Sequence, residues 1–112
     1  MKDCLFCRII RRELPSSIEY EDDDVLAFQD IHPAAPVHVL IIPKKHLERV
    51  SHMKTEEVPL MGRVLDAARR LAQARGWQDY RLVFNDGPEA GQTVYHVHLH
   101  LLSGRPMAWP PG

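Results

Sequence analysis

The feature that most constrains the fold is the alternation of histidine and apolar residues over Tyr95–Leu101 (YHVHLHL). Successive side chains of a β-strand point to opposite faces, so His96, His98 and His100 should share one face, about 6.5–7 Å apart. The apolar residues between them should face a core. The pattern therefore predicts a strand over residues 94–102 with one buried side and one histidine side.

The rest of the chain reads as an α+β domain. Asp3 is a candidate N-cap for a short helix that ends near Arg12, and strands are predicted over 18–20, 25–28, 37–42 and 80–84. From Thr55, apolar residues recur at three- and four-residue steps until Gly76, which predicts a long helix with one buried stripe. A chain of 112 residues has room for one domain. We therefore expect a single domain over residues 1–112, with a five-stranded, mainly antiparallel sheet, two helices and an extended, proline-rich tail over 103–112.

Charge and hydropathy exclude several classes of function. The net charge of -1 gives no general electrostatic reason to bind nucleic acid or an anionic membrane. No apolar run approaches the roughly 20 residues of a membrane helix. The N-terminal residues lack a cleavable hydrophobic segment, so a cytoplasmic location is expected.

The chain has seven histidines and only two cysteines, which favours histidine chemistry over a disulfide framework. An ordinary amphipathic strand is the simplest alternative for the histidine row, but chance would place only about 0.03 such rows in the whole chain. Neutral imidazoles ligate metals, transfer protons or attack electrophiles. The preceding segment Gly91-Gln92-Thr93, together with Asn85, offers amide and hydroxyl donors suited to phosphoryl oxygens. The combination favours phosphoryl chemistry.

The segment His96–Leu102 (HVHLHLL) resembles the histidine triad (HIT) superfamily. The similarity covers nearly the whole chain and points to the Hint branch, the histidine triad nucleotide-binding proteins that hydrolyse purine nucleoside phosphoramidates. The other similar segments are FQDI at 28–31, APVH at 35–38, IPKKH at 42–46, GQTVY at 91–95 and WPPG at 109–112.

This resemblance implies a homodimer in which two sheets join into one of ten strands, with each tail near the partner's site. It also implies that His98 attacks the α-phosphorus of a purine nucleoside phosphoramidate, forming a nucleotidyl-histidine that water hydrolyses. By resemblance, the catalytic positions are His38, His96, His98, His100 and Thr93. The implied nucleotide-binding positions are Phe28, Asp30, Ile31, Asn85, Gly91, Gln92, Thr93, His98, His100 and Trp109.

Gln29 and Thr93 depart from the residues common in familiar eukaryotic members, histidine and serine, which bears on the rate and on leaving-group preference. Two other functions stay open. One is hydrolysis of dinucleoside polyphosphates, within the same superfamily. The other is a nucleotide-binding scaffold with little turnover.

The pair Cys4 and Cys7 forms a CxxC motif, which by itself fits buried thiols, a redox pair or half of a metal site. Some HIT relatives carry structural zinc on such a pair and two histidines. By that resemblance the ligands here are Cys4, Cys7, His46 and His96, a closed set with no open coordination position. His32 and His52 are expected at the surface.

Overall fold

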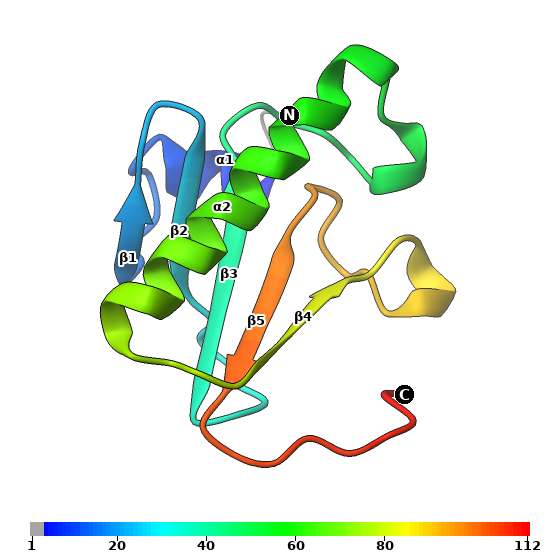
Figure 1. Cartoon of the computed structure of the whole chain (residues 1–112). Coiled ribbons are helices and arrows are strands. Elements are labelled where there is room, and N and C mark those ends of the chain that lie inside the picture. Colours follow the sequence, from blue (N-terminus) through cyan, green and yellow to red (C-terminus); the bar gives the residue numbers. More distant parts are fainter. Residues whose placement is uncertain (1–3) are drawn as a thin grey trace.

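Five strands form one antiparallel sheet, as expected from the sequence, and the structure arranges them in the order β1-β2-β3-β5-β4 (Figure 1). The computed structural model describes residues 4–112. The strands are β1 (Ile18–Glu21), β2 (Val25–Gln29), β3 (Val37–Pro43), β4 (Tyr80–Phe84) and β5 (Leu99–Ser103).

Two helices cover opposite faces of this sheet. The long helix α2 (Val58–Arg75) crosses one face, and the short helix α1 (Leu5–Ile10) lies on the other, behind the sheet in Figure 1. The strands β2 and β3 are therefore buried on both faces, which explains their continuous apolar sequences. Neither helix, nor any other described in residues 4–112, has the length and apolar character needed to span a membrane.

The register of β3 against β5 brings two histidines together. Leu40 lies opposite His100, and His38 lies opposite Leu102. Residues two apart on a strand share a face, so His38 and His100 are diagonal neighbours on the face that α1 covers. Two segments separated by about 60 residues of sequence thus meet through strand pairing.

The last strand is shorter than predicted. It begins at Leu99 rather than at residue 94, and it includes Ser103, which the sequence assigned to the tail. The amide of Val97 donates to the Leu47 carbonyl at 2.7 Å, outside the sheet ladder. Tertiary contacts of this kind hold residues 94–98 in an irregular path. Even so, Val97, Leu99 and Leu101 are buried as predicted.

The helix boundaries also differ from the prediction. The α-helical part of the long helix starts at Val58, after a 3₁₀ turn at Thr55–Glu57, because Pro59 has no N–H to donate to the Thr55 carbonyl. Gly76 ends it with a φ of 74°, as expected.

The short helix α1 ends two residues early. Arg12 adopts a φ of 62°, and the amides of Arg12 and Glu13 cap the carbonyls of Ile9 and Arg8. The predicted N-cap Asp3 lies outside the described residues, and the N-cap position belongs to Cys4, whose Sγ accepts from the Cys7 amide. Two further 3₁₀ turns lie at Val50–His52 and Pro88–Ala90.

Two leucines of α2 provide a matched test of the buried stripe. Leu71 is 4% exposed against the sheet, whereas Leu65 is 45% exposed. We predict that Leu71→Ala lowers the free energy of unfolding by about 2–5 kcal/mol, since it removes buried methyl groups and leaves a cavity. Leu65→Ala should cost less than about 1 kcal/mol. Urea denaturation at equal protein concentration measures both, and equal losses would contradict the packing described.

Candidate active site and metal centre

A pocket of about 410 Å³ lies beside α1, on the face of the sheet that carries the histidines. His98, His100 and Thr93 line one part of it, and Phe28, Asp30 and Ile31 line another. The structure therefore brings six of the predicted catalytic and nucleotide-binding residues to one cavity. Its remaining walls are Leu5, Phe6, Ile9, Leu14, Pro15, Ser16, Gln29, His32, Leu40 and Val94.

A backbone hydrogen bond determines which nitrogen of His98 can react. Its Nδ1 lies 2.8 Å from the His96 carbonyl oxygen, so Nδ1 must carry the proton and donate. The lone pair of the neutral ring is then on Nε2. Burial lowers the pKa of His98 below its ordinary value, although the His96 carbonyl and the Asp30 carboxylate oppose this shift. At neutral pH the ring is consequently a neutral imidazole with its proton on Nδ1 and a nucleophilic Nε2.

His38 and His100 have complementary tautomers. The Ala34 amide donates to Nδ1 of His38 at 3.0 Å, so the proton of the neutral His38 ring is on Nε2. This Nε2–H lies 2.9 Å from Nδ1 of His100 and donates to it. The proton of His100 is therefore on Nε2, a buried atom with no partner in residues 4–112. Burial is the largest cause of the low pKa of His100, about 4, so this ring is neutral and presents one free N–H.

The loop before the histidines has a different arrangement from the one expected. The side chain of Gln92 is 3% exposed, and its amide bonds the Gly87 amide and the carbonyls of Glu48 and Val94. It therefore holds the loop together and has no free donor. Gly91 has a φ of 93°, and a Cβ at this position would lie 3.7 Å from Nδ2 of Asn85.

Four predicted nucleotide-binding residues do not line the pocket of the single chain: Asn85, Gly91, Gln92 and Trp109. Trp109 is 82% exposed in the C-terminal tail. His38 and His96 also lie outside its lining, but each contacts a residue of the pocket wall: His38 lies beside Asp30, and His96 packs against Phe6.

The two cysteines and two histidines of the predicted metal set meet in a second cluster. The Nδ1 atoms of His46 and His96 are 3.2 Å apart. Cys4 Sγ lies 3.4 Å from Nδ1 of His96, and Cys7 Sγ lies 3.3 Å from Nδ1 of His46 and 3.6 Å from that of His96. For Zn–N of about 2.0–2.1 Å and Zn–S of about 2.3 Å, the edges of a tetrahedron between ligand atoms are about 3.3–3.8 Å long. The donor set thus fits a tetrahedral zinc ion.

The two histidines of this cluster are in a form that can bind a cation, because both rings are neutral and have a lone pair. Nε2 of His96 donates to the Pro43 carbonyl at 2.7 Å, which leaves a lone pair on Nδ1 toward the cysteines. Burial lowers the pKa of His96 to about 4 and that of His46 below its ordinary value. Burial, together with the neighbouring Cys4, raises the pKa of the Cys7 thiol to about 11 without a metal. A bound cation would favour the thiolates instead.

The helix α1 connects the two clusters. Phe6 lies between the two cysteines in sequence, and its ring packs edge-on against His96 and His98, with centroids 5.9 and 5.2 Å apart. It also contacts Phe28 of the pocket. The sequence did not indicate that Leu5, Phe6 and Ile9 of this helix line the pocket. It also favoured a surface location for His32, which is exposed yet lines the pocket. No sequence signal separates core from pocket here, because both need apolar side chains.

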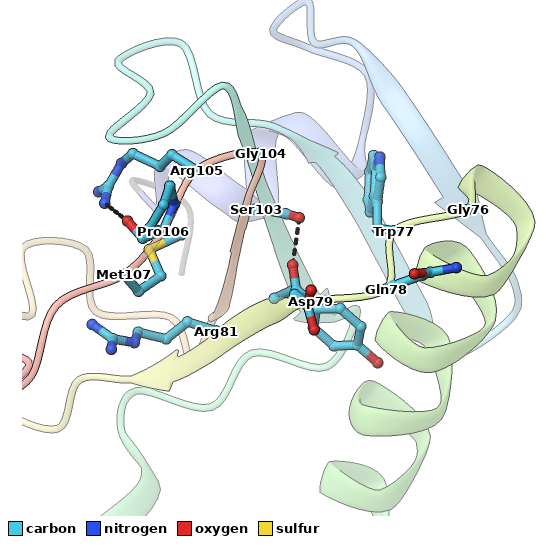
Figure 2. Close-up of a pocket in the computed structure, with 11 residues that line it drawn as sticks. Gly76, Trp77, Gln78, Asp79, Arg81, Ser103, Gly104, Arg105, Pro106 and Met107 are labelled. Carbon is cyan, nitrogen blue, oxygen red and sulfur yellow. Dashed lines mark hydrogen bonds between the residues drawn. The ribbon is translucent and has the colours of Figure 1, made fainter.

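A larger depression, of about 860 Å³, lies beside β4 and the start of the tail (Figure 2). Ser103 donates to the Asp79 carbonyl in its wall, and Arg81 and Arg105 donate to backbone carbonyls of Ala108, Pro106 and Ala34. It contains no histidine or cysteine. These contacts anchor the tail, and the candidate chemistry lies in the histidine pocket.

Comparisons with known proteins agree with this geometry. An uncharacterized HIT-like protein of Synechocystis sp. is 54% identical over 112 residues, covering 99% of this chain and 98% of the relative. A 14 kDa zinc-binding protein of Brassica juncea is 48% identical and covers 98% of this chain and 100% of its own. The crystal structure of a HIT family hydrolase from Legionella pneumophila superposes with a TM-score of 0.94 at 50% identity, over 98% of this chain and 100% of that one. The profile of the HIT domain matches residues 11–107, and the chain therefore belongs to the HIT domain family.

Proposed function

We propose that this protein hydrolyses purine nucleoside 5′-phosphoramidates through a covalent intermediate on His98, as expected of the Hint branch. The observation that carries the proposal is the tautomer of His98. Its Nδ1–H donates to the His96 carbonyl, so the lone pair of the neutral ring is on Nε2. The ring lies in the wall of the pocket. The solved HIT family hydrolase of similar structure supports a hydrolytic reaction.

The proposed reaction has two steps. Nε2 of His98 attacks the α-phosphorus, the P–N bond breaks, and the amine leaves with the bonding electron pair and takes up a proton. Water then attacks the phosphorus, releases His98 and yields the nucleoside monophosphate. The Nε2–H of His100 is the donor proposed for a phosphoryl oxygen, because it is buried and has no partner in the described chain. The Thr93 hydroxyl, also in the pocket wall, is proposed to assist the leaving group.

The nucleoside is proposed to occupy the apolar part of the same pocket. Phe28 and Ile31 would contact the base, and Asp30 would accept hydrogen bonds from the ribose hydroxyls. Asn85 and the backbone of Gly91 and Gln92 would complete the phosphate site from the loop. Because Gln92 commits its side chain to backbone groups, we assign that side chain to holding the loop.

A homodimer would give Trp109 a partner and would bring each tail toward the other subunit's site. Exposed apolar side chains support such an assembly: Leu82 lies on β4, at an edge of the sheet, and Val58 lies on α2. An unpaired edge strand is a ready template for pairing with another chain. Joining two copies through this edge would produce the ten-stranded sheet implied by the resemblance.

We also propose a structural zinc ion on Cys4, Cys7, His46 and His96. The distances and tautomers of the cluster support it, and the zinc-binding protein of Brassica juncea is a close relative. Bound zinc would crosslink α1 to the segment that carries the histidines. All four positions are taken by protein ligands, so the ion would leave no open position for substrate.

The nucleophile can be tested with adenosine 5′-phosphoramidate. We predict that His98→Asn lowers the rate of monophosphate release by at least about 10⁴-fold, because the covalent route is lost. The exposed histidine variant His52→Asn should keep the wild-type rate. Wild-type protein that binds the nucleotide without turnover would instead indicate a scaffold, and faster turnover of diadenosine polyphosphate would assign the other substrate class.

The metal centre can be tested with a matched pair of histidine variants. Wild-type protein purified without chelator should contain about one zinc per chain, and His52→Asn should match it. His46→Asn should lose the metal and have a lower Tm, because one of four ligands is removed. Elemental analysis and thermal unfolding measure both effects. Less than about a tenth of an equivalent of zinc in folded wild-type protein would refute the site.

A further inference from the structure

Asp30 contacts both the backbone and the histidine pair. Its Oδ1 accepts from the His32 amide at 2.8 Å, which fixes the orientation of the carboxylate. Its Oδ2 lies 3.4 Å from Nε2 of His38, the nitrogen that carries the proton. The carboxylate therefore lies next to the same N–H that donates to His100.

We infer that Asp30 is a positioning residue for the phosphoryl chemistry, acting through His38 on His100 in addition to any contact with the ribose. This inference rests on the proposed function.

The donors and acceptors around His38 and His100 favour one tautomer of each ring. The Ala34 amide and the Asp30 carboxylate act on opposite nitrogens of His38, and both favour the tautomer with hydrogen on Nε2. That tautomer makes Nδ1 of His100 an acceptor and leaves the hydrogen of His100 on Nε2. This last atom is the buried donor without a partner. Through the His38 ring, the carboxylate thus helps to keep hydrogen on Nε2 of His100, the donor proposed for the phosphoryl oxygen.

Asp30 also places a negative charge beside the histidines. When neutral His98 forms a bond to phosphorus through Nε2 and keeps its Nδ1–H, the ring becomes an imidazolium. Three imidazoles lie together here, with ring centroids 4.8 Å apart for His98 and His100 and 5.2 Å for His38 and His100. Asp30 is the carboxylate beside them, and its charge raises the pKa of His38 and His100 against the larger effect of burial. It therefore offsets positive charge that would otherwise accumulate in a buried site.

A metal ion on the same three side chains is the competing interpretation, since Asp30, His38 and His100 lie close enough to share one. The hydrogen bonds argue against it. Nδ1 of His38 already accepts from the Ala34 amide, so Nε2 of the neutral ring has no lone pair for a metal. The hydrogen bonds from Ala34 to His38 and from His38 to His100, with the 3.4 Å contact between Asp30 and His38, account for the proximity of these side chains without a metal.

The test separates the two roles of Asp30 by removing the sugar contact from the substrate. The 2′,3′-dideoxy form of adenosine 5′-phosphoramidate has no hydroxyls for the carboxylate to bind. We expect Asp30→Asn to lower kcat on this substrate by about tenfold or more, equivalent to about 1.4 kcal/mol. The exposed acidic control Asp23→Asn removes the same net charge and should leave kcat unchanged. Equal kcat for wild type and Asp30→Asn on the dideoxy substrate would overturn the inference.

A double-mutant cycle tests whether the effect passes through His38. In a His38→Gln background, Asp30→Asn should cause a smaller further loss of kcat on the dideoxy substrate, because the connecting ring is absent and only the direct effect of its charge remains. Full, additive losses would refute the proposed path.

Nitrogen-15 NMR of the imidazoles gives a readout that does not need turnover. In the wild type, His38 and His100 should both carry hydrogen on Nε2, and Asp30→Asn should shift these tautomers. Unchanged tautomers would overturn the inference. If the wild type hydrolyses neither substrate, the proposed function fails, and the NMR result alone decides whether Asp30 positions the histidines.

Discussion

Burial of imidazole rings against backbone polar groups is the interaction on which the rest of this structure depends. Each of three buried histidines has one ring nitrogen bonded to the main chain: His98 to the His96 carbonyl, His96 to the Pro43 carbonyl and His38 to the Ala34 amide. These bonds settle which nitrogen holds the proton, and burial keeps the rings neutral. One residue type thereby provides the lone pair of the proposed nucleophile, a lone pair for the proposed metal ion and a chain of hydrogen-bond donors.

The short helix α1 contacts both the cysteine–histidine cluster and the histidine pocket. Cys7 and the N-cap Cys4 belong to the cluster proposed to bind zinc, while Phe6 packs against His96 and His98. A six-residue helix has little intrinsic stability, since isolated helices of this length do not form in water. It is held by apolar contacts with the sheet and, in our proposal, by zinc. The part of the pocket wall that Leu5, Phe6 and Ile9 form therefore exists only when α1 is packed on the sheet.

Much of the fold could be predicted from local pattern. The hairpin of β1 and β2, the buried strand β3 and the end of α2 at Gly76 follow from β-branched runs, turn residues and a left-handed C-cap. The length of β5 could not be predicted, because the Val97 amide bonds a loop residue 50 positions away. The role of the Gln92 side chain in holding its loop could not be predicted for the same reason, because it donates to the Glu48 carbonyl, which is distant in sequence.

The sequence by itself determined the chemistry available to this protein. Alternating histidines, a CxxC motif and the segments shared with the HIT family are local strings of residue types, and they identified the family, the fold class and the nucleophile that we propose. Only the tertiary structure decided how the histidines differ. Tautomer, neutrality and the contact of Asp30 with His38 depend on strand register and on backbone groups far away in the chain, and such contacts exist only once the sheet and α1 have packed together.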